Sequence, residues 1–161
     1  MHIKMIVDED IINYKKPSMM IGTVVCTWKC CDDACIPHST CQNYGWNIAP
    51  IYNIPNEDII ERYMNNVYTD AIIFAGLEPF DQFDELITFI DKFREVSNDD
   101  VVIYTGYNKN EICDQVKQLS RYKNIIVKFG RYIPDQESTF DELLGVKLAS
   151  PNQHAEYISL L

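Results

Sequence analysis

The sequence lacks several features that would each direct it to a common class of function. None of its apolar runs approaches the roughly 20 residues of a membrane-spanning helix. The amino terminus lacks the basic-then-apolar order of a secretory signal, and no glycine-rich phosphate loop of the P-loop or dinucleotide type is present. We therefore expect a cytoplasmic protein, without a membrane partner, that neither hydrolyses nucleotides nor transfers hydride.

Basic charge is also scarce. The chain has 14 Lys and Arg against 24 Asp and Glu, which gives a formal net charge of −10. Because no basic stripe is present to release counterions from phosphates, nucleic-acid binding is excluded as its function. The acidic residues are spread through the predicted helices, which is typical of solvated helix faces, although such a surface also steers a protein toward a basic partner protein.

Cysteine, by contrast, is concentrated in one stretch. Five of the six cysteines fall within 16 residues, Cys26–Cys41, directly after the apolar run Met19–Val25. In a reducing cytosol such thiols bind metal rather than form disulfides. Thiolates at the carboxyl end of a strand suit soft metals, so residues 26–43 predict a loop that holds either an iron–sulfur cluster or zinc. The sixth, Cys113, is interpreted as a small buried residue of a helix.

The 161-residue sequence predicts one α/β domain, residues 1–161, with enough apolar content (47%) for a packed core. Asn56 is expected to cap a helix, and Asn108 with Glu111 resembles a capping box. We expect strands at 3–7, 18–25, 70–75, 101–104, 124–128 and 143–148, helices at 56–67, 81–93 and 108–119, and an ordered loop at 44–54.

This alternation of strands and helices predicts βαβ units and a mostly parallel sheet. Ligands of such sheets bind at the carboxyl ends of the strands. The cysteine loop, Gly76–Pro79 and Thr105–Tyr107 all follow predicted strands and fall at that edge.

Four short motifs follow one another along the sequence, and their order matches that of a known family. Three residues separate Cys26 from Cys30, and Cys41 is followed by Gln42 and Asn43. Gly76-Leu77-Glu78-Pro79 and Tyr104-Thr105-Gly106-Tyr107 each end a predicted strand, and the carboxyl-terminal stretch contains Ser150, Asn152 and Gln153. In this order, over residues 14–153, the motifs resemble the radical S-adenosylmethionine proteins, and within them the small activating proteins of anaerobic (class III) ribonucleotide reductase.

The resemblance implies a small partial (βα) barrel with a curved, mostly parallel sheet, and a 4Fe–4S cluster on three cysteines. Cys26 and Cys30 match the first two ligands of the family. Cys41 is preferred as the third because of the Gln42–Asn43 context, with Cys35 and then Cys31 as rivals. Ten residues separate the second and third ligands where the family usually has two, so this loop carries an insertion.

Three thiolates on a cubane leave one iron open to chelate S-adenosylmethionine. The resemblance implies that the turn with Gly76, Glu78 and Pro79 binds the methionine ammonium of this cofactor, with Leu77 in place of the family's second glycine. Trp28 either covers the cluster or packs locally. Further cofactor contacts are expected from Thr105, Gly106, Trp28 and Asn43.

The implied activity is reductive cleavage of S-adenosylmethionine, with transfer of the radical to a glycine of a glycyl radical enzyme, first of all the large subunit of anaerobic ribonucleotide reductase. A flavodoxin-like or other low-potential electron donor is the second implied partner. Three alternatives stay open: a radical enzyme that modifies a small molecule, such as a deazaguanine-type synthase, a degenerate member that keeps the cluster without cleaving the cofactor, and a zinc or iron–sulfur binding module without catalysis.

Overall fold

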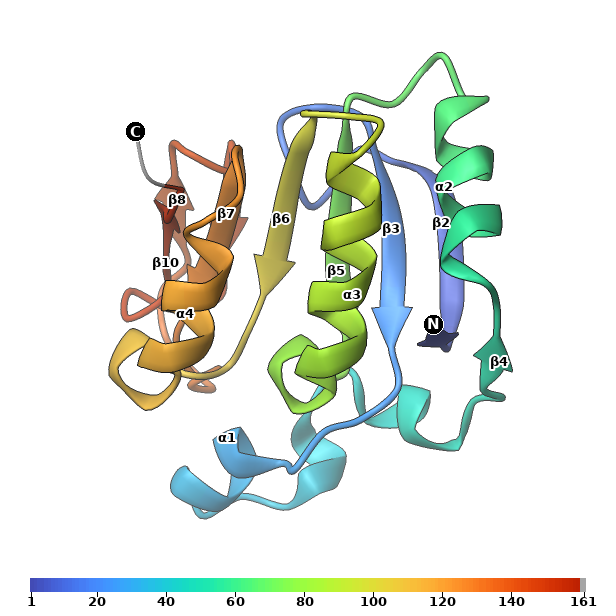
Figure 1. Cartoon of the computed structure of the whole chain (residues 1–161). Helices are drawn as coiled ribbons and strands as arrows, with labels where there is room; N and C mark the ends of the chain where they lie inside the picture. Colours follow the sequence, from blue (N-terminus) through green and yellow to red (C-terminus); the bar gives the residue numbers. More distant parts are fainter. Residues whose placement is uncertain (160–161) are drawn as a thin grey trace.

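The computed structural model describes residues 1–159 and centres on a six-stranded sheet (Figure 1). Its strands are β2 (Met5–Asp10), β3 (Ser18–Thr23), β5 (Ala71–Gly76), β6 (Asp100–Tyr104), β7 (Ile125–Phe129) and β10 (His154–Tyr157). The order across the sheet is β10-β7-β6-β5-β3-β2. The four central strands are parallel and both edge strands are antiparallel to their neighbours. The predicted α/β class with a mostly parallel sheet is confirmed.

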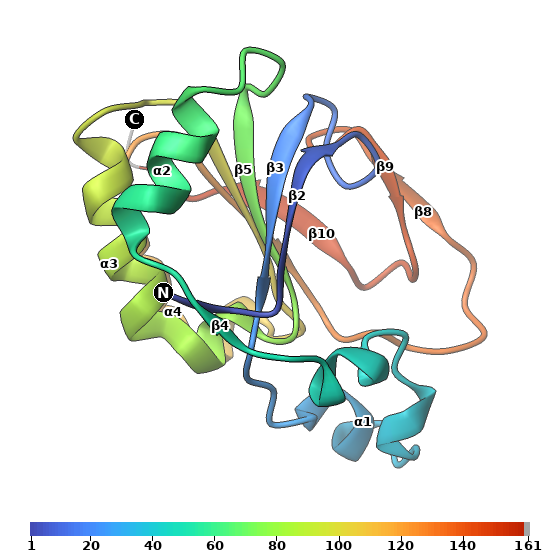
Figure 2. The ribbon, with the colours of Figure 1, turned by 90° about the vertical axis from the view of Figure 1, so that its right-hand side faces the viewer.

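Three helices cover one face of this sheet: α2 (Asn56–Met64), α3 (Phe83–Arg94) and α4 (Cys113–Leu119) (Figures 1 and 2). Alternate strand residues point toward them. The main core forms between the helices and these side chains, among them Ile72, Phe74, Val101, Ile103, Ile125, Val127 and Phe129. No helix in the described part of the chain is long and apolar enough to cross a membrane.

The opposite face carries a smaller apolar cluster. Tyr14, Leu144 and Leu148 pack there against the intervening strand residues Ala71, Ile73, Val102 and Ile126. The hairpin formed by β8 (Thr139–Asp141) and β9 (Val146–Leu148) lies on this side, away from the helices (Figure 2). This cluster covers the amino-terminal end of the parallel strands on this face. It does not extend to their carboxyl ends.

Short elements complete the chain at the carboxyl ends of the parallel strands. The cysteine loop forms α1 (Lys29–Asp33) and two 3-10 turns, η1 (His38–Thr40) and η2 (Tyr44–Ile48). In Figure 1 this segment lies below the arrowheads of β3 and β6. The segment then returns through β4 (Tyr52–Asn53), which pairs with β1 (His2–Ile3). The span 44–54, predicted as an ordered loop, thus contains a 3-10 turn and a short strand.

Three predictions about helices need correction. Pro55, not Asn56, occupies the position before the first helical residue of α2, and the helix ends before Val67, which is 85% exposed. Cys113 is exposed rather than buried, because it lies on the solvent side of the first turn of α4. The capping box is present, with the amide of Asn108 donating to Glu111 Oε2 at 2.8 Å, but it caps the 3-10 turn η4 (Lys109–Glu111), and the helix expected at 108–119 begins only at Cys113.

The strand predictions fail at the two ends of the chain. The expected strand at 3–7 is divided into β1 and β2. The expected last strand at 143–148 is β9, which pairs with β8 and not with the main sheet. The true last strand, β10, was missed because its sequence, His154-Ala155-Glu156-Tyr157, has no apolar run and belongs to an edge that is only partly buried.

We expect the substitution Phe89→Ala to lower the free energy of unfolding by about 3 to 5 kcal/mol, because it opens a cavity in the helix-side core. Phe89 is fully buried, with its ring edge-on to Phe74 at 5.3 Å and stacked on Phe93 at 6.1 Å. Urea unfolding followed by circular dichroism measures the change. The matched control Phe140→Ala, at a ring that is 57% exposed, should change stability by less than about 0.5 kcal/mol. Equal effects would contradict this location of the core.

Candidate functional site

A cavity of about 610 Å³ opens at the carboxyl edge of the sheet, on the face that the helices leave free. Met20, Ala75, Tyr104 and Lys128, one from each parallel strand, line its wall. They belong to the same alternating set as the small apolar cluster: Ala75, Tyr104 and Lys128 each lie two residues beyond a member of that cluster in the same strand. The cysteine loop and the segment from β9 to Gln153 close the other sides. The volume is that of a typical small-molecule site.

The cavity brings together nearly all the residues predicted for the site. Cys26, Cys30 and Cys41 line it, as do Trp28, Asn43, Gly76, Glu78, Thr105 and Gly106. Pro79 is the exception, because it is buried at the start of the 3-10 turn η3 (Pro79–Gln82), behind the Gly76–Glu78 turn. Of the two rival ligands, Cys31 is buried and lines the cavity, whereas Cys35 is exposed and is not among its lining residues.

Two of the preferred cysteines accept backbone hydrogen bonds in the same way. The amide of Trp28 donates to Cys26 Sγ at 3.3 Å, and the amide of Asn43 donates to Cys41 Sγ at 3.4 Å. Each bond joins a cysteine to the residue two positions later, and amide donors of this kind stabilise a thiolate. The feature marks the two ends of the loop.

Burial works against free thiolates at this site. It raises the pKa of Cys26 to about 12, and it also raises the pKa of Cys30, where the positive charge of Arg131 acts in the opposite direction. Without metal these thiols are therefore protonated at neutral pH. Metal binding must release their protons, which couples loading of the site to pH.

The Gly76–Glu78 turn is tied to both neighbouring loops. Gly76 has a φ of 92°, and a Cβ there would lie 3.2 Å from the Cα of Gly22, so only glycine fits. The amide of Glu78 donates to the carbonyl of Val25 at 2.7 Å. Its carboxylate accepts from the amides of Phe80 (3.1 Å) and Gly106 (2.9 Å). Burial raises the pKa of Glu78 to about 7, in spite of these donors.

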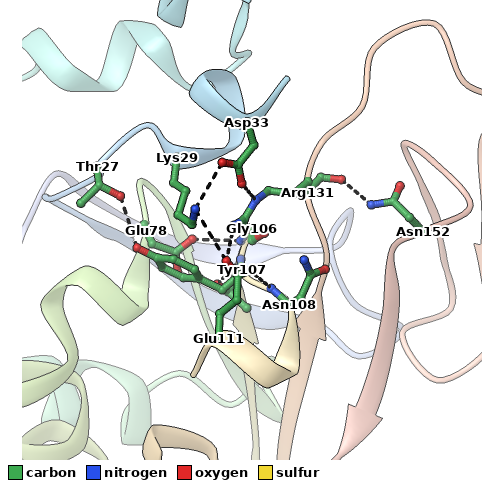
Figure 3. A network of polar contacts seen from close by, with 11 residues as sticks. Thr27, Lys29, Asp33, Glu78, Gly106, Tyr107, Asn108, Glu111, Arg131 and Asn152 are labelled. Atoms are coloured by element: carbon green, nitrogen blue, oxygen red, sulfur yellow. Dashed lines mark hydrogen bonds and ion pairs between the residues drawn. The ribbon is translucent and has the colours of Figure 1, made fainter. Parts of the chain in front are cut away.

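Two basic residues of the site were missed by the sequence reasoning. Lys128 is 7% exposed, lines the cavity and donates to the carbonyl of Gly130 at 3.2 Å. Burial lowers its pKa to about 8, against the opposing effect of Glu78. Arg131 is buried beside α1 within a network of carboxylates (Figure 3). A lysine inside the apolar strand Ile125–Phe129 was the available signal for Lys128.

The aromatic side chains of the loop pack on one another. Trp28 stacks on His38 with ring centroids 5.5 Å apart and is tilted against Tyr44 at 5.6 Å. His38 also pairs with Asp32 through Nε2 at 2.7 Å. Trp28 therefore packs locally and also lines the cavity, and its covering of a cluster stays a prediction.

The carboxyl-terminal motif lies across the cavity from the cysteine loop. Ser150 donates to Asn152 Oδ1 at 2.6 Å, and Asn152 donates to the carbonyl of Arg131 at 2.9 Å. Gln153 lines the cavity and donates to the carbonyl of Gly130 at 3.3 Å. The motif thereby fixes the turn that follows β7.

A family model described as "4Fe-4S single cluster domain" matches residues 21–153, from β3 through the cysteine loop to Gln153. The chain belongs to the 4Fe-4S single cluster domain family. It is thus an iron–sulfur protein, and the family favours a cluster over the zinc alternative. Neither the curated proteins nor the solved structures contain a match to the chain.

The site of this single-cluster protein suits a cluster in its shape as well as in its donors. Within residues 1–159, no three His, Cys, Asp or Glu side chains meet closely enough to hold one metal ion. The thiols instead border a wide cavity. A cubane binds each thiolate at a different iron, so its ligands need not converge on one point. Amide donors at Cys26 and Cys41, and the cations Lys128 and Arg131, are complementary to an anionic group.

The raised pKa of Glu78 predicts a specific pH dependence of the metal-free protein. A native carboxyl group that holds its proton up to pH 7 stabilises the fold below pH 4.5 and loses this contribution as the pH rises through 7. Between pH 5 and 7.5, the free energy of unfolding of the wild type should therefore fall by roughly 2 kcal/mol relative to Glu78→Gln. Chemical unfolding of the reduced protein at each pH measures the difference.

Glu57→Gln is the control for this pH dependence. The hydrogen bond from Lys92 lowers the pKa of Glu57, so its titration lies below the measured range. The stability difference between the wild type and Glu57→Gln should stay constant from pH 5 to 7.5. A constant difference for Glu78→Gln as well would contradict the raised pKa of Glu78.

Proposed function

We propose that this iron–sulfur protein is a radical S-adenosylmethionine enzyme that activates a glycyl radical enzyme. One observation carries the proposal: a single cavity is lined by Cys26, Cys30 and Cys41, by the Gly76–Glu78 turn and by Thr105–Gly106. These segments are far apart in the sequence, and each matches a different motif of the radical S-adenosylmethionine proteins. Helices on one face of the sheet and a cavity on the other also agree with a partial barrel of that type.

In this proposal Cys26, Cys30 and Cys41 hold the cluster. Cys26 and Cys41 have amide donors to their sulfurs, and Cys30 lines the cavity between them. Cys31 remains the rival for the third ligand because it too lines the cavity. Cys35 is a weaker rival, since it is exposed and does not line the cavity.

The Gly76–Glu78 turn is suited to an ammonium group. Two of the lone-pair sites of the Glu78 carboxylate accept from backbone amides, which leaves others for a ligand. A bound ammonium would lower the pKa of Glu78 and keep it ionised, because a nearby positive charge favours the carboxylate and offsets the effect of burial. The buried ammonium of Lys128, which also lines the cavity, is complementary to the carboxylate of the same cofactor.

Held by Cys26, Cys30 and Cys41, a reduced 4Fe–4S cluster would supply the one electron needed for cleavage of the C5′–S bond of S-adenosylmethionine, which yields methionine and a 5′-deoxyadenosyl radical. This chain's own residues position the cofactor and keep water away from it. The cavity has apolar walls, which exclude water and donate no protons. They are formed by Met20, Ala75, Val146 and Leu148. A low-potential donor, flavodoxin-like or other, supplies the electron.

We assign the hydrogen donor to a glycine of a partner, the large subunit of anaerobic ribonucleotide reductase in the first place. Removal of one Cα hydrogen forms 5′-deoxyadenosine and leaves a glycyl radical. Beyond the sheet, its helices, the cysteine loop and the β8–β9 hairpin, residues 1–159 contain little structure with which to enclose a second substrate. A radical enzyme with a small-molecule substrate of its own is the alternative.

The ligand assignment predicts how single Cys→Ala variants behave after anaerobic reconstitution with iron and sulfide. Cys26→Ala, Cys30→Ala and Cys41→Ala should lose most of the 4Fe–4S electron paramagnetic resonance signal of the dithionite-reduced protein, because each removes a ligand. Cys35→Ala is the matched control from the same loop and should retain the signal. A Cys41→Ala protein with a full signal, together with a Cys31→Ala protein without one, would assign the third ligand to Cys31 instead.

The activity itself predicts a product and a radical. The reduced holoprotein with S-adenosylmethionine should form 5′-deoxyadenosine and methionine, detected by chromatography, and Glu78→Ala should reduce this rate by about 10-fold or more. With anaerobic ribonucleotide reductase present, a glycyl radical should form on the reductase. Cleavage without any glycyl radical would favour a small-molecule substrate, and a loaded cluster without cleavage would identify a degenerate member.

A further inference from the structure

The ion-pair network around Arg131 connects three segments of the site (Figure 3). Its Nε donates to Asp33 of α1 at 2.8 Å, and one terminal nitrogen donates to the carbonyl of Gly106 at 2.5 Å. The other terminal nitrogen donates to Glu111 Oε1 at 2.6 Å. Arg131 is only 8% exposed. A buried guanidinium with three acceptors in a fixed fork is a rigid connection between the segments that supply them.

The same contacts attach the cysteine loop to the sheet. Asp33 is the last residue of α1, which also carries Cys30. The start of the loop is attached separately, because the amide of Thr27 donates to Asp81 at 2.8 Å. Tyr107, whose ring lies under the guanidinium of Arg131 at 5.4 Å, donates to the same carboxylate at 2.6 Å. The helix with Cys30 is thus fixed at both ends, and Arg131 fixes the far one.

Cys30 lies against the residue that Arg131 holds. A Cβ on Gly106 would collide with Cys30 Sγ, so the sulfur is in direct contact with the backbone of Gly106. Arg131 binds the carbonyl of this same glycine. The position of the sulfur relative to the sheet therefore depends on Arg131 through Gly106 on one side and through α1 on the other.

The neighbouring lysine does not replace this connection. Lys29 lies 3.2 Å from Asp33 and 3.8 Å from Glu111, but its side chain is 43% exposed against 10% for Arg131. Exposed ion pairs contribute little, and a single ammonium has no planar fork with which to bind several acceptors at once.

We propose that Arg131 is a positioning residue for the iron–sulfur cluster. It fixes α1 and Gly106 so that Cys30 keeps its place as a ligand, and its permanent positive charge favours the reduced, more negative form of the cluster. The inference rests on the proposed ligand role of Cys30, but it does not depend on cleavage of S-adenosylmethionine.

The test compares Arg131→Gln and Arg131→Lys with the wild type as reconstituted holoproteins. Two quantities are measured: the rate at which an iron chelator removes the cluster, and its midpoint potential by redox titration followed by electron paramagnetic resonance. Arg131→Gln should lose iron about 10-fold faster, the usual scale for a lost partner of a metal ligand, and its midpoint potential should shift to lower values. Arg131→Lys should also lose iron faster but retain the potential of the wild type, because it keeps the charge without the fork.

Arg94→Gln is the matched control. Arg94 donates to the carbonyls of Ser97, Lys123 and Asn124, away from the cysteine loop, and neither quantity should change. If Arg131→Gln does not fold, Asp33→Asn carries the test, since it releases α1 while Arg131 keeps its charge, and it should lose iron faster without a fall in potential.

The proposal would be overturned if Arg131→Gln lost iron at a rate within twofold of the wild type and its midpoint potential equalled that of the wild type within error. Faster iron loss in Arg131→Gln with an unchanged potential would overturn it as well, because this result indicates a structural role alone. Cys30→Ala is tested in parallel: a complete cluster in this variant would overturn the ligand role of Cys30 and the inference that rests on it. The cleavage assay remains separate, so failure of the proposed enzymatic activity leaves the result for Arg131 intact.

Discussion

The site depends on one constraint, the alternation of side chains along four parallel strands. Each strand sends one set of residues to the helices and the other to the opposite face. The first set forms the main core, and the second forms the small cluster at one end and the cavity wall at the other. A shift of one residue in any strand would exchange the two sets and remove the cavity.

Polar contacts then connect the loops that meet at this edge. The Glu78 carboxylate accepts from the amide of Gly106, and the Glu78 amide donates to the carbonyl of Val25, so this residue joins the turn after β5 to the turn after β6 and to the start of the cysteine loop. Arg131 joins the turn after β6 to α1. These groups are buried but well supplied with partners, as buried polar groups must be if they are not to destabilise the fold. They give a cysteine loop with little secondary structure a defined place.

The local patterns of the sequence predicted the elements well where burial was strong. Ala71–Phe74 and Val101–Tyr104 form continuous apolar runs, and both are central strands. The predictions failed where the structure is partly exposed. β10 has polar residues because it lies at an edge, and Val67 continues an apolar pattern beyond the end of its helix into solvent. The spacing of apolar residues indicates which side chains are buried, so it no longer predicts a helix or strand that is largely exposed to solvent.

The sequence by itself determined the chemistry: the cysteines between residues 26 and 41, the Gly76–Pro79 turn and their placement after strands all follow from residue type and order. Only the tertiary structure decided which of these groups meet. It separated the exposed Cys35 from the four cysteines that line the cavity, and it brought Lys128 and Arg131 to the site. The reason is physical: a side chain's partners come from other strands and loops, and neither their distance nor their burial is contained in the local sequence that surrounds it.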